Sequence, residues 1–86
     1  MPQSASQAPT REEIDAESRQ IRRLGIAVSM TIQVIAQGGV SLAEALEMAE
    51  ATRKLAQILF PGKESVYEIL YGRKIRGLIA SVYHLN

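Results

Sequence analysis

Residues 24–44 read LGIAVSMTIQVIAQGGVSLAE, an apolar run followed by two glycines and a capping sequence. Apolar residues recur every three or four positions before the glycines, which predicts a helix. Gly38 and Gly39 predict where that helix ends, because glycine readily adopts the left-handed conformation that closes a helix. Ser41 and Glu44 form a capping box, the usual start of a new helix. The stretch therefore predicts two helices joined by a tight turn.

The first of these helices is predicted to begin well upstream of the apolar run. Thr10 and Glu13 form a second capping box, and acidic residues crowd the turns that follow it, where the helix dipole favours negative charge. Residues 1–9 carry no charge and consist mainly of Pro, Ser, Gln and Ala. Because such a composition buries little apolar surface, we expect residues 1–9 to be a disordered tail.

The remainder of the chain predicts one more helix. Pro61 and Gly62 end the second helix, and Ser65 with Glu68 resembles a third capping box. No segment alternates apolar and polar residues as a strand would. We therefore expect an all-α fold, a single domain over 10–86 with helices over 10–37, 41–60 and 65–84 joined by short loops.

The composition argues against catalysis and metal binding. The chain has 86 residues, no Cys and one His, so disulfides, thiolate metal sites and His-rich metal sites are excluded. His84 lies two residues from the end of the chain, and no base is placed to activate a serine. We expect a protein that is not an enzyme and takes no cofactor, metal or small-molecule substrate.

The sequence also favours a cytoplasmic protein that does not enter the membrane. Its first residues lack the basic and apolar regions of a secretory signal. The most apolar stretch, Leu24 to Ala36, is shorter than the roughly 20 apolar residues needed to span a bilayer. The absence of Cys is consistent with a reducing compartment.

The predicted helices have more apolar surface than three helices of this size need. The first helix carries a second apolar stripe opposite its main one, and the third helix has two apolar sectors. Because large exposed apolar patches are rare on monomers, we expect oligomerisation, most simply a homodimer, to complete the fold. The predicted interface consists of Ile26, Met30, Val34, Tyr71, Ile75 and Leu78. This pattern predicts a helical adaptor or regulator that acts through protein–protein contact, and an inhibitor that docks on an enzyme would have the same pattern.

The distribution of charge supports an alternative. Residues 1–52 carry a net charge of −3 and residues 53–86 a net charge of +4. Such a basic half suits a nucleic-acid-binding regulator, of DNA rather than RNA. The turn at 35–41 also resembles that of a helix-turn-helix motif, but Glu44, Glu47 and Glu50 on the following helix would repel phosphates. The basic residues left for this role are Arg22, Arg23, Arg73, Lys74 and Arg76.

Overall fold

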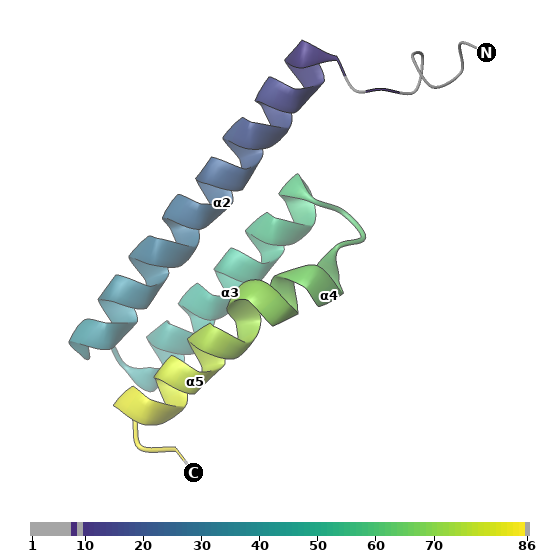
Figure 1. Ribbon diagram of the computed structural model, residues 1–86. Helices are drawn as coiled ribbons and strands as arrows, with labels where there is room; N and C mark the ends of the chain where they lie inside the picture. The colour runs from purple at the N-terminus through teal and green to yellow at the C-terminus, as the bar shows by residue number, and fades with distance from the viewer. Residues whose placement is uncertain (1–7, 9, 86) are drawn as a thin grey trace.

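A computed structural model describes residue 8 and residues 10–85 of the chain, and over these residues the protein is all helical (Figure 1). The helices are α2 (Arg11–Gln37), α3 (Leu42–Leu59) and a third segment composed of α4 (Glu64–Tyr67), the π-helical turn η1 (Glu68–Gly72) and α5 (Arg73–Val82). The predicted three-helix all-α domain is confirmed for this part of the chain. Apart from Ala8, the tail expected over 1–9 lies outside the described residues.

Helix α2 begins and ends at the predicted positions. The Thr10 side chain accepts a hydrogen bond from the Glu13 backbone N–H, and the Glu13 carboxylate accepts one from the Thr10 N–H. At the other end Gly38 has a φ of 70°, the left-handed conformation that the sequence predicted. Only the carboxyl-terminal half of α2 supplies buried residues, and the first of these is Leu24.

Helix α3 runs back along α2 and packs closely against it. It begins at the predicted capping box of Ser41 and Glu44. Its buried face is built from small residues: Ala45, Thr52 and Ala56. Small side chains at these positions let the two helix axes approach.

The third segment packs against both α2 and α3, at their lower ends in Figure 1. Ile75 and Ile79 insert into the core, which also contains Leu24, Val28 and Ile35. The Tyr83 hydroxyl donates to the Val40 carbonyl oxygen at 2.5 Å, which ties the end of the segment to the turn between α2 and α3.

One local prediction is wrong. The third helix begins at Glu64, and its N-cap residue, Lys63, makes no side-chain capping hydrogen bond. Ser65 therefore lies inside the first turn and cannot cap it. On the exposed side of α3, the planar guanidinium of Arg53 donates two hydrogen bonds to the Glu50 carboxylate.

Candidate interaction surface

The six residues predicted to form an interface do not share one surface. Ile75 is 2% exposed and belongs to the core of the single chain. Ile26 and Met30 lie exposed on the outer side of α2, and Met30 is 60% exposed. Val34, Tyr71 and Leu78 are half-buried, and the last two pack against the core. An interface through Ile26 and Met30 stays a prediction, whereas Ile75 is already covered by its own chain.

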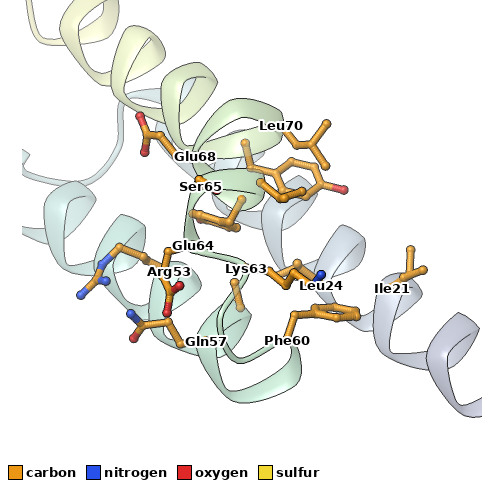
Figure 2. Close-up of a pocket in the computed structure, with 14 residues that line it drawn as sticks. Ile21, Leu24, Arg53, Gln57, Phe60, Lys63, Glu64, Ser65, Glu68 and Leu70 are labelled. Carbon is orange, nitrogen blue, oxygen red and sulfur yellow. The ribbon is translucent and has the colours of Figure 1, made fainter.

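The structure instead brings other apolar side chains together around a groove. A cavity of about 620 Å³ lies between α2, the end of α3 and the turns of α4 and η1 (Figure 2). We call it the apolar groove. Its deepest lining residues are the buried Leu24, Ala56 and Tyr67. The exposed apolar side chains that line its sides are Ile21, Val66 and Leu70.

The link between α3 and α4 creates this groove. Phe60 ends α3, and Gly62, with a φ of 80°, turns the chain so that α4 begins away from α2. The π-helical turn that follows brings Tyr67 and Tyr71 together with ring centroids 5.8 Å apart. The third segment therefore contacts α2 mainly along α5. Between α2 and α4 the space is not filled, and this space is the apolar groove.

Two of the four charged side chains that line the groove, Arg53 and Glu68, form ion pairs, whereas Lys63 and Glu64 form none among the described residues. The Arg76 guanidinium donates two hydrogen bonds to the Glu68 carboxylate and holds the pKa of Glu68 below its usual value. Arg53 does the same for the pKa of Glu50. Burial raises the pKa of the Tyr67 hydroxyl, which therefore stays neutral. The groove thus offers a largely apolar lining with a balanced charged edge, a surface suited to an apolar occupant rather than to a strongly charged ligand.

The basic residues predicted for nucleic-acid binding are all exposed but not gathered into one patch. Arg22 and Arg23 are consecutive on α2 and so diverge by about 100° around its axis. On α5, Arg76 is held by Glu68, while Arg73 and Lys74 make no ion pair among the described residues.

The described residues hold no cluster of three potential metal ligands, and His84 is exposed beyond the end of α5. Within the same residues, no helix is both long enough and apolar enough to cross a membrane.

Sequence reasoning missed the groove residues as a group, although part of the signal was present. Val66, Ile69 and Leu70 fall on a second side of the third helix, away from the core-facing stripe. The sequence could not show that the link at 60–63 would hold Phe60, Val66 and Leu70 across from Ile21.

No known protein family, curated protein or solved structure matches this chain. Its function is therefore argued from its own residues and geometry.

Proposed function

We propose that this protein is a small, non-enzymatic helical adaptor or regulator of the cytoplasm that acts by self-association and protein–protein contact. The main support for this proposal is the apolar groove, because the apolar side chains along its sides are about half exposed to solvent. Leu70, for example, is 58% exposed. Covering such side chains is favourable by about 25 cal/mol for each Å² of apolar surface removed from water.

The groove is one part of a larger excess of exposed apolar surface. Among the described residues, ten large hydrophobic residues are exposed, more than the eight hydrophobic residues that form the buried core. A monomer gains nothing from this arrangement, whereas an assembly removes the surface from water. This imbalance supports an assembly over a monomer that acts alone.

Sedimentation equilibrium tests the proposal. Over about 1–200 µM protein, a range that covers micromolar dissociation constants, we expect the mass to rise from 9.4 kDa to about twice that value. Leu70→Glu places a charge at the groove and should lower the association constant at least about tenfold. Ile58→Glu is the matched control, because Ile58 is the most exposed hydrophobic residue, at 75%, and does not line the groove.

A mass of 9.4 kDa at every concentration would contradict self-association. Equal weakening by Leu70→Glu and Ile58→Glu, with helicity retained, would contradict the role of the groove. Circular dichroism of each variant provides the check that the fold is retained.

Binding of nucleic acid is a second candidate, favoured by one observation. Arg73 and Lys74 are exposed on α5 without an ion pair among the described residues. If they contact phosphates, duplex DNA should bind at about 50 mM salt and be released at about 200 mM salt. The double change Arg73→Gln, Lys74→Gln should then abolish binding without changing the mass of the protein. Unchanged affinity in that variant would rule out this surface.

A further inference from the structure

Helix α2 is longer than the bundle that it belongs to. In Figure 1 its amino-terminal end extends well past the end of α3. The stretch 11–23, about 20 Å long, contains no buried residue. An isolated helix of this length is marginal in water, so packing of an apolar face normally supports such a stretch. Among the described residues, no other segment buries a side chain of this stretch.

This extension nevertheless has an apolar side, and that side belongs to the groove. Ile14 and Ile21 are seven residues apart, so they lie within about 20° of each other around the helix. Ile21 lines the groove, and Ile14, which is 50% exposed, continues the same side two turns further out. An occupant of the groove that also covers Ile14 must therefore lie along α2.

The charges of the extension indicate which occupant fits. Residues 11–18 carry a net charge of −3, and residues 19–23 carry +3. None of these charges takes part in an ion pair among the described residues. A second copy that runs antiparallel along the first would place the acidic part of each helix against the basic part of the other. A parallel copy would place like charges together.

We propose that the apolar groove receives the amino-terminal turns of α2 from a second copy, in an antiparallel α2–α2 pair with its two-fold axis near Ser18. This inference rests on the proposed self-association and specifies its geometry. In this arrangement Ile14 of the second copy is about level with Ile21 of the first and covers the groove. By symmetry each copy both donates and receives the extension, so neither copy is left with an uncovered groove.

The same geometry pairs Asp15 of each copy with Arg22 of the other. Asp15 and Arg22 are seven residues apart and lie on the same flank of the isoleucine side of α2. When two antiparallel helices are related by a two-fold axis, the same flank of each helix faces the other copy. Two reciprocal ion pairs therefore border the contact between Ile14 and Ile21.

Cysteine cross-linking tests the geometry directly, because the natural chain contains no Cys. Ser18→Cys places one thiol of each copy beside the axis, and we expect oxidation to link the pair covalently. Arg11→Cys is the matched control on the same flank. Its two thiols would lie about 21 Å apart along the helices, too far for a disulfide. Cross-linking of Arg11→Cys as well, or of neither variant, would overturn the proposal.

Charge reversal tests the same contact without a covalent bond. Asp15→Arg and Arg22→Asp should each weaken association about tenfold, because each creates two like-charged contacts. Combining both changes in one chain, or mixing the two single variants, should restore association. Failure of both combinations to restore it would overturn the proposed pairing.

Different results would contradict the proposed self-association and the proposed antiparallel geometry. If the unmodified protein stays at 9.4 kDa, both the proposed self-association and this geometry are wrong. If it dimerises but Ser18→Cys does not cross-link and charge reversal has no effect, self-association stands and the antiparallel α2 pair is wrong.

Discussion

At the scale of single residues, one polar contact stands out in the core. The hydroxyl groups of Thr31 and Thr52 are buried and lie 3.0 Å apart, joining α2 to α3. Thr52 donates its only hydroxyl hydrogen to the Met48 carbonyl oxygen at 2.9 Å. Thr31 must therefore be the donor between the two threonines.

This direction predicts unequal costs for two similar substitutions. Thr52→Val removes the acceptor and leaves a buried donor on Thr31, which should cost about 1–3 kcal/mol. Thr31→Val removes only the donor and should cost about 0.5–1 kcal/mol. The double variant should be more stable than Thr52→Val alone, because no orphaned donor remains. Urea unfolding measures all three, and equal costs for the single variants would show that the assigned direction is wrong.

The two glycines inside the third segment differ in their surroundings. A Cβ at Gly77 would meet no atom within 4 Å, whereas a Cβ at Gly72 would collide with the Glu68 carboxylate. Gly77→Ala should therefore stabilise the protein by up to about 1 kcal/mol through helix propensity alone. Gly72→Ala should gain less, because it displaces Glu68 from Arg76. Thermal unfolding gives both values, and a loss of stability in Gly77→Ala would contradict an open surface there.

The pair between Glu68 and Arg76 also predicts a pH dependence. Because Arg76 lowers the pKa of folded Glu68, the contribution of this pair is present above the unfolded pKa of Glu68. It is lost as the pH falls through the folded pKa. NMR titration should give a lower pKa for Glu68 in the natural protein than in Arg76→Gln. The stabilities of the two proteins should converge in acid, and a constant difference down to low pH would argue against the pair.

At the scale of elements, the caps explain which helix boundaries were predictable. Thr10 and Ser41 are each followed three residues later by a Glu, and the structure confirms both capping boxes. Ser65 is also followed three residues later by a Glu. However, the chain turns at Gly62 and the helix begins at Glu64, one residue before Ser65. The difference depends on backbone geometry in the preceding link, which a residue pattern does not specify.

This difference gives a matched pair of substitutions. Ser41→Ala removes a side-chain acceptor from the start of α3 and should cost about 1 kcal/mol. Ser65→Ala lies within a helical turn and should change the stability by no more than about 0.5 kcal/mol. Chemical unfolding of the two variants makes the comparison. A substantial loss for Ser65→Ala would mean that Ser65 does cap the third helix.

The helical pattern of the third segment was predictable, whereas its exposed side was not. The sequence predicted two apolar sectors on the third helix, and the structure buries one of them through Tyr67, Ile75 and Ile79. Periodicity shows which residues share a side, but not whether their own chain or another covers that side. Ile75 was therefore assigned to an interface although α2 and α3 cover it.

At the scale of the whole molecule, the account depends on the amino-terminal extension of α2. A helix that projects alone from a small bundle opens readily, with a local free energy of opening near zero. The same helix, packed against a second copy, is stabilised in proportion to how strongly the copies associate. The behaviour of this stretch therefore reports on self-association more directly than any property of the core.

Amide hydrogen exchange of residues 14–23, measured across a range of protein concentrations, is the most direct test. The account predicts that these amides are weakly protected in dilute solution and become more protected as the concentration rises. The core amides around Thr52 serve as the reference, and their protection should change much less than that of the extension. Exchange of residues 14–23 that stays fast and independent of concentration would contradict the central claim that this fold is completed by a second copy.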